Sequence, residues 1–258
     1  MSIEFMVTEV TLENVEKTGF FCYMSARKSE GFKHKLDWVK VRLAEGLKIK
    51  MVLPPHGRGF IEYLPGEFAW RAVNAAGYMF IHCVWVVGKS KGSGVASHLL
   101  ALCEHDAAAL GLNGVAMVTS ESRYMVKPGY LEKKGYKAVD QAPPSFTLMV
   151  KKFKDAPDPA FCGDWEAKAR RFGKGLTVVR ADQCPYLESA AQAARGWAEE
   201  AGLEFHDVIL ETSKEVREKA PSAYSVYNLV YNGILVGDQY MNKASVLEKV
   251  HSIDDMLN

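Results

Sequence analysis

The sequence lacks three features that would each point to a particular class of protein. It has no excess of charge of one sign, because 32 Lys and Arg balance 31 Asp and Glu for a net charge of +1. Bulk electrostatics therefore do not favour a nucleic-acid partner. No apolar run approaches the roughly 20 residues that span a membrane, and Glu4 and Glu9 interrupt the pattern of a signal peptide. We expect a cytoplasmic protein with no membrane partner.

Closely spaced cysteine pairs are also missing. The five cysteines are Cys22, Cys83, Cys103, Cys162 and Cys184. This scatter is typical of reduced thiols in a cytoplasmic protein. His98, Cys103 and His105 fall on one predicted helix without a dependable zinc spacing, so we expect no metal site.

What the sequence does contain is a basic, glycine-rich turn between an apolar run and a helix. The β-rich run Ile81–Val87 is followed by Gly88-Lys-Ser-Lys-Gly-Ser-Gly94, and helical spacing of apolar residues begins at Val95. A helix N-terminus offers unpaired N–H groups and partial positive charge, and glycines let a phosphate approach the backbone. Lys89 and Lys91 add full charges. The turn therefore indicates a site for the pyrophosphate of a nucleotide-type cofactor.

Three phosphate-binding motifs can be compared with this turn. It does not supply a Walker A pattern, and it meets the dinucleotide fingerprint only in part, through Gly92, Gly94 and Ser97. The run Lys91-Gly-Ser-Gly94-Val-Ala96 resembles the R/Q-x-x-G-x-G/A motif of the GNAT superfamily of acetyltransferases, with Lys91 in place of Arg or Gln.

Neighbouring segments resemble the same superfamily. Gly114–Ser120 reads as the next strand, residues 129–136 resemble its late Y-E-K-x-G-F helix and turn, and Phe146–Lys152 reads as a closing strand. The resemblance covers residues 1–153 and implies an α+β fold with a mixed sheet. The elements expected upstream of the turn are strands over 4–10, 48–53 and 59–64 and a helix over 32–44.

A turn-rich segment, residues 154–175, is expected to link this half to a second domain over 176–258. The second block has the order β-α-β-α-β-β-α, with Asn232-Gly233 predicting a type I′ hairpin turn. This order resembles a smaller thioredoxin-like domain. Residues 221–251 in particular resemble the C-terminal extension of YoaP-type acetyltransferases.

The thioredoxin resemblance places Cys184-Pro-Tyr-Leu187 at the redox loop and Pro221 at the position of the family's cis-proline. Leu187 replaces the second cysteine of C-x-x-C, so this loop cannot form an internal disulfide. Cys184 at a helix N-terminus stays a candidate thiol site.

The GNAT resemblance implies acetyl-CoA as cosubstrate, with direct attack by an amine in a ternary complex. It places the cofactor's pantetheine along Cys83–Val87, with backbone pairing to Val86 and Val87. The pyrophosphate would be cradled by the backbone N–H groups of Lys91, Gly92, Ser93, Gly94, Val95 and Ala96.

The proton donor for the departing thiolate is less clearly marked. The tyrosine of Y-E-K-x-G-F corresponds to Leu131, and Tyr130 lies one residue earlier. One helical residue turns a side chain by about 100°, so Tyr130 reaches the same place only through a shifted register. Tyr130 is the candidate general acid, with Tyr124 or water as alternatives.

Candidates for the general base are Glu67 and His82, with Glu62 also near the central strand. Strand alternation predicts that His82 and Cys83 face opposite sides of the sheet.

Two alternative functions stay open. In one, the GNAT-like half is a scaffold without catalysis, and the thioredoxin-like half acts as a thiol- or peptide-binding adaptor. In the other, the chain is a dinucleotide oxidoreductase, which the antiparallel pattern of its first half disfavours. The sequence specifies neither the amine acceptor nor the oligomeric state.

Overall fold

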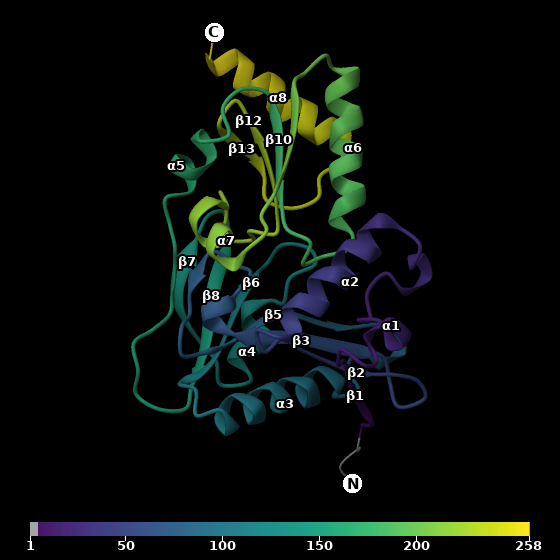
Figure 1. Cartoon of the computed structure of the whole chain (residues 1–258). Coiled ribbons are helices and arrows are strands. Elements are labelled where there is room, and N and C mark those ends of the chain that lie inside the picture. The colour runs from purple at the N-terminus through teal and green to yellow at the C-terminus, as the bar shows by residue number, and fades with distance from the viewer. Residues whose placement is uncertain (1–4, 258) are drawn as a thin grey trace. The chain divides into compact units, whose positions relative to one another are not determined.

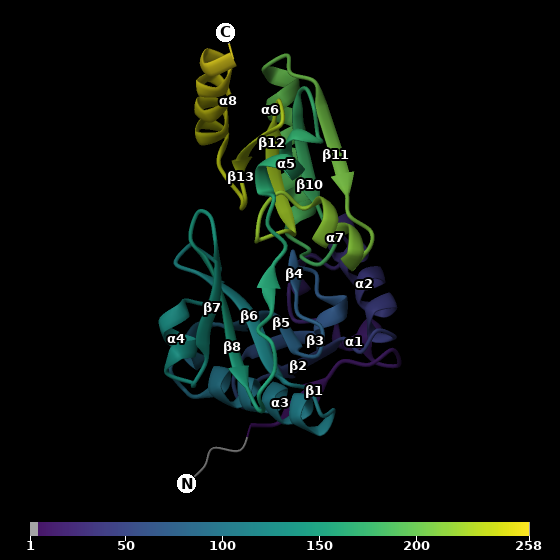
Figure 2. The same cartoon turned by 90° about the vertical axis from the view of Figure 1, so that its left-hand side faces the viewer.

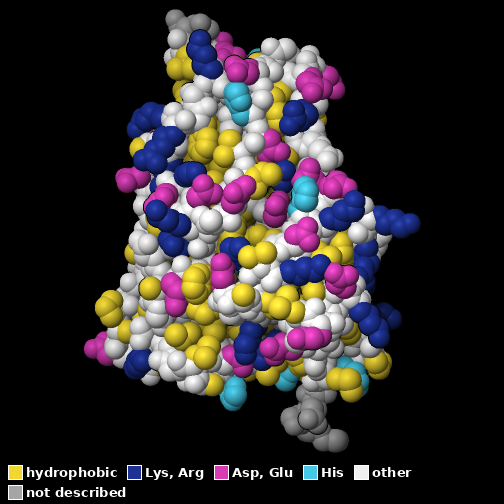
Figure 3. Space-filling view, in the orientation of Figure 1, with side chains coloured by type: hydrophobic (Ala, Val, Ile, Leu, Met, Phe, Trp, Pro, Cys, Tyr) yellow, Lys and Arg dark blue, Asp and Glu magenta, His cyan; other side chains and the backbone are white. Residues whose placement is uncertain are grey.

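The computed structural model describes residues 5–257 and divides the chain into two compact units (Figures 1 and 2). The first unit contains positions 5–27, 36–69 and 74–161, and the second contains 28–35, 70–73 and 162–257. Two short segments of the N-terminal half thus cluster with the C-terminal residues, a grouping that differs from a linear division at 153 and 176. On the face shown in Figure 3, acidic and basic side chains are intermixed.

A seven-stranded mixed sheet organises the first unit, in the order β1-β2-β3-β5-β6-β8-β7. Only β5 and β6 pair in parallel; the other neighbours are antiparallel. This arrangement confirms the predicted α+β class with a mixed sheet. The strands are β1 (Val7–Glu9), β2 (Lys48–Val52), β3 (Gly59–Pro65), β5 (Met79–Val86), β6 (Gly114–Ser120), β7 (Lys137–Ala142) and β8 (Phe146–Lys152). Two short strands, β4 (Val73–Asn74) and β9 (Ala160–Phe161), form a separate sheet.

The helices over 30–43, 95–109 and 128–132 lie close to predicted positions, whereas the helix over 15–18 was not predicted. These helices are α1 (Val15–Thr18), α2 (Glu30–Leu43), α3 (Val95–Ala109) and α4 (Pro128–Glu132), with short 3₁₀ turns at Met24–Ala26, Gly66–Phe68 and Gly88–Ser90. The strand expected from Glu4 begins at Val7; Glu4 itself lies outside the described residues.

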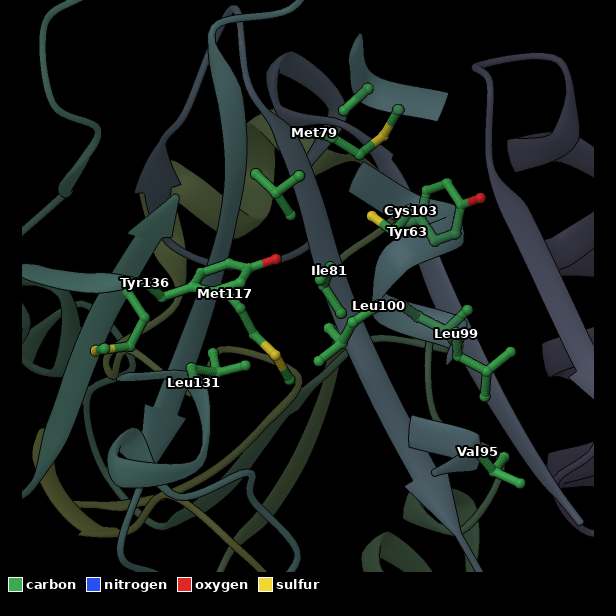
Figure 4. Close-up of a cluster of buried hydrophobic side chains, with 14 of the residues drawn as sticks. Tyr63, Met79, Ile81, Val95, Leu99, Leu100, Cys103, Met117, Leu131 and Tyr136 are labelled. Carbon is green, nitrogen blue, oxygen red and sulfur yellow. The ribbon is translucent and has the colours of Figure 1, made fainter. Parts of the chain in front are cut away.

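Helix α3 covers one face of the sheet and forms the core there (Figure 4). Val95, Leu99 and Cys103 are fully buried against sheet residues such as Ile81 and Met117. Their spacing of four residues places them on one side of the helix, which is the amphipathic pattern the sequence predicts. Burial of this row fixes the start of α3 against the central strands.

The second unit contains a four-stranded sheet in the order β11-β10-β12-β13. Strand β11 pairs with β10 in parallel, and β12 pairs with β10 antiparallel. Its elements are α5 (Trp165–Arg170), β10 (Leu176–Arg180), α6 (Leu187–Glu200), β11 (Phe205–Ile209), α7 (Ser213–Lys219), β12 (Tyr227–Tyr231), β13 (Ile234–Gly237) and α8 (Lys243–Leu257).

The β12–β13 hairpin has the predicted turn. Asn232 and Gly233 have φ values of 48° and 77°, and Tyr231 pairs with Ile234 across them, as a type I′ turn requires. The expectation of a cis-proline at 221 is wrong: among the described residues, the cis peptide bonds precede Pro55 and Pro144.

Candidate functional site

Strands β5 and β6 diverge soon after they begin. Their parallel pairing joins only Met79–Ile81 to Val115–Met117, although β5 continues to Val86 and β6 pairs with β8 along its whole length. In Figure 4 the strand bearing Ile81 and the strand bearing Met117 separate toward the start of α3. Among the described residues, the second half of β5 therefore pairs with β3 along one edge and with no strand along the other, and this unpaired edge is called the opening.

The backbone of β5 determines which groups face this opening. The Val87 N–H donates to the carbonyl of Arg58, 3.0 Å away, on the β3 side. Since peptide groups of successive strand residues point to opposite edges, those of Val86 face the opening. The expected pairing of a cofactor with Val86 stays a prediction. The expected pairing of a cofactor with the Val87 N–H needs correction, because this N–H already donates to the Arg58 carbonyl.

The glycine-rich turn follows directly and ends at the N-terminus of α3. Gly92 and Gly94 have φ values of 79° and 93°, a backbone region in which residues with a Cβ are strained. A Cβ at Gly92 would meet no atom within 4 Å. The first helical hydrogen bond runs from the His98 N–H to the Gly94 carbonyl, so the N–H groups of Val95 and Ala96 lie in the helix end that has no intrahelical acceptors.

The predicted cradle residues are thus brought together at one exposed turn. Lys89, Lys91, Gly92, Ser93 and Gly94 are exposed, and Val95 is buried beneath them. The Ser93 N–H and hydroxyl both donate to the Ser90 carbonyl. Lys91 N–H donates to Gly88. The donors of Lys91 and Ser93 therefore hold the turn closed, and those of Gly92, Gly94, Val95 and Ala96 are the better placed for an anion.

The segment at the start of β3 also contacts this turn, and it was not identified from the sequence. The Arg58 N–H donates to Ser90 Oγ at 2.9 Å. A Cβ on Gly59 would come within 2.9 Å of both Val86 and Val95, so only glycine allows β3 to pack this closely. The sequence Gly57-Arg-Gly59 marks this segment, but Ser90, which accepts the hydrogen bond from the Arg58 N–H, lies 32 positions away along the chain.

Tyr130, the candidate acid, lies in α4 and packs against the core beneath α3, as does the adjacent, fully buried Leu131. Its hydroxyl oxygen is buried and has no hydrogen-bond partner among the described residues. A buried hydroxyl without a partner is unfavourable by about 1–3 kcal/mol. The position therefore suits a ligand group that accepts a hydrogen bond. Tyr124, the alternative, is 69% exposed.

Of the three candidate bases, His82 and Glu62 lie next to each other, whereas Glu67 lies elsewhere. His82 Nδ1 lies 3.2 Å from Glu62 Oε1, with both side chains buried. The Trp38 and Phe80 rings lie beside the imidazole, at 6.2 and 5.8 Å between centroids. Glu67 is exposed and lies apart from them, on the Gly66–Phe68 turn beyond the end of β3.

A β-bulge gives His82 its position. The β3–β5 register passes from Glu62 opposite Cys83 to Tyr63 opposite Ile81, so His82 is the extra residue. Ile81 and Val84 both pack on the α3 side, three positions apart. Strict alternation, on which the expected opposite orientation of His82 and Cys83 depended, is therefore broken here.

Cys184 lies in the second unit, half-buried against its core. The loop around it is close-packed, because a Cβ on Gly31 of α2 would collide with the carbonyl of Pro185. Within the part of the chain that the structure describes, no cluster of His, Cys, Asp or Glu side chains is arranged to hold a metal. In the same residues, no helix is long and apolar enough to cross a membrane.

Among solved structures, the chain is similar to aminoglycoside 6′-acetyltransferase type Ii, with 16% identity, 59% of this chain and 100% of that chain covered, and a TM-score of 0.44. It is also similar to a GNAT family acetyltransferase from Brucella melitensis in complex with acetyl-CoA, with 16% identity, coverage of 62% and 96%, and a TM-score of 0.39. These values are too low to establish a function.

No family model matches the sequence. A curated relative from Bacillus subtilis (strain 168), described as "Uncharacterized N-acetyltransferase YoaP", is 31% identical over 238 residues, which cover 91% of this chain and 94% of the relative. The similarity therefore extends over residues of both units. The chain belongs to the family of YoaP N-acetyltransferases.

Proposed function

We propose that the protein transfers an acetyl group from acetyl-CoA to an amine by direct attack in a ternary complex. The observation that carries this proposal is the exposed glycine-rich turn at the start of α3, beside the half of β5 that β6 leaves unpaired. An anion site and an open strand edge are thus adjacent. A cofactor with a pyrophosphate and an extended, amide-containing arm fits both.

Each part of acetyl-CoA has candidate partners among these residues. The N–H groups of Gly92, Gly94, Val95 and Ala96 would hold the pyrophosphate, with Lys89 and Lys91 contributing charge. The backbone of Val86 would pair with the pantetheine arm. The unpartnered hydroxyl of Tyr130 supports its assignment as the donor to the departing thiolate. When bound, acetyl-CoA supplies the thioester.

For the base we favour His82 over Glu67. If Nδ1 of His82 carries hydrogen, Glu62 accepts it, which makes Nε2 the basic nitrogen. A carboxylate beside the imidazole also stabilises the cation that forms when the amine gives up its proton. Bringing the amine and the thioester together in one opening would supply much of the rate gain.

We also propose that the C-terminal unit has a thioredoxin-like fold without dithiol chemistry. Its strand order and its parallel β10–β11 pair support this assignment. Leu187 is buried where a second cysteine would be needed. The free cysteines suit a cytoplasmic location. An adaptor acting through Cys184 is less favoured, because residues 28–35 pack on this loop within the same unit.

The test is transfer of labelled acetyl from acetyl-CoA to four classes of amine: a small polyamine, an aminoglycoside, a peptide N-terminus and a protein lysine. We expect labelled product and stoichiometric CoA release with at least one class. The His82→Gln variant should lose most of the rate, and Glu67→Gln should retain it. Binding of acetyl-CoA without transfer to any class would favour the adaptor function instead.

A further inference from the structure

Aromatic side chains gather on the face of the first sheet that lies away from α3. The rings of Phe21 and Phe60 stack, with centroids 4.8 Å apart and planes 29° apart. Trp85 lies directly opposite Phe60 across the β3–β5 pair, so these two side chains share one face of the sheet. Their strand neighbours Ile61 and Val84 pack on the α3 side, and alternation therefore directs Phe60 and Trp85 to the other side. Phe21, Phe60 and Trp85 are called the aromatic wall.

Two features of the aromatic wall indicate a binding surface and not only a core. Trp85 is 37% exposed, on the half of β5 that β6 leaves unpaired. Phe21 has a φ of 78°, which is a strained conformation for a bulky side chain. Core packing in this segment is supplied by Phe20, which is 1% exposed. Strain of this kind is concentrated at ligand-binding sites, so the ring of Phe21 is held on Phe60 for a purpose beyond filling the core.

The aromatic wall lies beside the candidate base. Phe60 and Glu62 are two positions apart on β3, so their side chains project from the same face and their Cα atoms are about 7 Å apart. Glu62 contacts His82. An amine whose nitrogen reaches His82 would therefore place its substituent against Phe60 and Trp85.

A positive charge lies at the other end of the aromatic wall. Arg58 is exposed, and its guanidinium carbon lies 5.9 Å from the centroid of the Phe21 ring. Arg58 and Glu62 are four positions apart on the same side of the chain, or about 13 Å between Cα atoms. This face of the sheet therefore presents a base, an aromatic surface and a cation, in that order.

We propose that the acetyl acceptor is an aromatic amino compound with a carboxylate. Its amine would lie at His82, its ring on Trp85 and Phe60, and its carboxylate near Arg58. The inference rests on the proposed function and names the class of its acceptor. A free aromatic amino acid and a short peptide with an aromatic first residue both have this chemistry.

The step itself is the one proposed above. The neutral amine nitrogen forms a bond to the acetyl carbonyl carbon, and the C–S bond breaks with its electron pair going to sulfur. The proton that the nitrogen loses to His82 is balanced by the proton that the sulfur gains. The aromatic wall and Arg58 transfer nothing and only orient the acceptor.

The experiment compares kcat/KM for phenylalanyl-glycine with the values for three relatives: cyclohexylalanyl-glycine, phenylalanyl-glycinamide and free phenylalanine. Phenylalanyl-glycine should exceed the cyclohexyl compound by about threefold or more, because stacked rings attract beyond the area they bury. It should exceed the amide by about threefold, because the amide lacks the carboxylate. The larger value between phenylalanine and its dipeptide identifies the source of the acceptor. Calorimetric titration of each compound into CoA-saturated protein should give the same order of affinity without turnover.

Two variants separate the ring from the charge. In Trp85→Leu the preference for phenylalanyl-glycine over the cyclohexyl compound should fall toward one. Phe153→Leu is the matched control, because Phe153 is an aromatic residue of the first unit with a similar exposure of 39%, and it should keep the wild-type preference. Arg58→Gln should remove only the preference for the carboxylate, since the backbone hydrogen bond to Ser90 is retained.

Equal kcat/KM for the phenyl and cyclohexyl compounds in the wild-type protein would overturn the proposal, as would a preference that survives Trp85→Leu. Transfer to spermidine with none to the aromatic compounds would also overturn it and would leave the proposed function intact. If no amine accepts acetyl, the proposed function itself fails, a result that is distinguishable from the others.

Discussion

At the scale of single residues, binding of acetyl-CoA should depend most on the charge beside the glycine-rich turn. Lys91 is exposed at this turn. Replacing it with Glu reverses a charge where a pyrophosphate is expected, so Lys91→Glu should weaken acetyl-CoA binding at least tenfold, or roughly 1.4 kcal/mol. The loss should shrink as salt is added. Calorimetric titration measures it.

Lys137→Glu is the control for that change, since it makes the same substitution at an exposed position at the start of β7. It should leave the affinity for acetyl-CoA unaltered. Equal affinities for wild type and Lys91→Glu would mean that the turn does not hold the cofactor's phosphates.

Tyr130→Phe tests the assignment of the acid. Loss of a positioned general acid should lower kcat by about 10²-fold or more while the affinity for acetyl-CoA stays close to wild type. Tyr124→Phe, an exposed tyrosine a few positions earlier, should behave as wild type. Steady-state kinetics with an amine that accepts acetyl measure kcat for both variants. A wild-type kcat for Tyr130→Phe would show that this tyrosine is not the general acid.

Features that depend only on the local backbone, such as the conformation of the glycine-rich turn, could be predicted from the sequence. The positive φ of Gly92 and Gly94 and the exposure of Lys91 follow from the motif itself. The pairing of Glu62 with His82 could not be predicted, because it depends on a bulge that shifts β3 against β5. A bulge depends on the register of two strands and leaves no composition signal in either one.

At the scale of elements, two glycines in helices should respond in opposite ways to the same substitution. Gly31 in α2 has no room for a Cβ, which would collide with the Pro185 carbonyl, whereas Gly196 in α6 has open space. Gly196→Ala should stabilise the protein by about 1 kcal/mol through helix propensity. Gly31→Ala should destabilise it, because backbone atoms must move apart.

Thermal unfolding of the two variants separates these effects. A shift of roughly 2–4 °C per kcal/mol is expected for a chain of this size. If Gly31→Ala melts at or above the wild-type temperature, α2 does not pack on the Cys184 loop as described.

Elements that depend on neighbouring residues in the sequence were predictable, whereas features that depend on the pairing of distant strands were not. The Asn232-Gly233 hairpin formed as predicted because its turn type follows from two residues. Helix α6 begins at Leu187, shortly after Cys184, which was expected at a helix N-terminus. The divergence of β5 from β6 could not be predicted, since it depends on where a parallel register ends, and neither strand alone specifies its register.

At the scale of the whole molecule, stability at low pH should depend on Asp106. Burial alone would raise the pKa of this carboxyl, but hydrogen bonds from Tyr63, Lys48 and Lys50 outweigh burial and hold the pKa well below its ordinary value. A lowered folded-state pKa stabilises the protein above the unfolded pKa of about 4, and this stabilisation is lost as pH falls below it.

Asp106→Asn should therefore lower the free energy of unfolding at pH 7, and its difference from wild type should narrow toward pH 3. Urea unfolding at both values measures this. Glu121→Gln is the control, because its ion pair with Lys127 is exposed and should contribute little. A difference that is constant with pH would contradict the role of Asp106.

The central claim is that the turn and the opening beside β5 hold acetyl-CoA, and the most direct test is isothermal titration of the wild-type protein with acetyl-CoA, with NADH as the control nucleotide. We expect saturable, one-to-one binding of acetyl-CoA in the micromolar range and no binding of NADH at the same concentrations. Absence of acetyl-CoA binding, or equal binding of NADH, would contradict it.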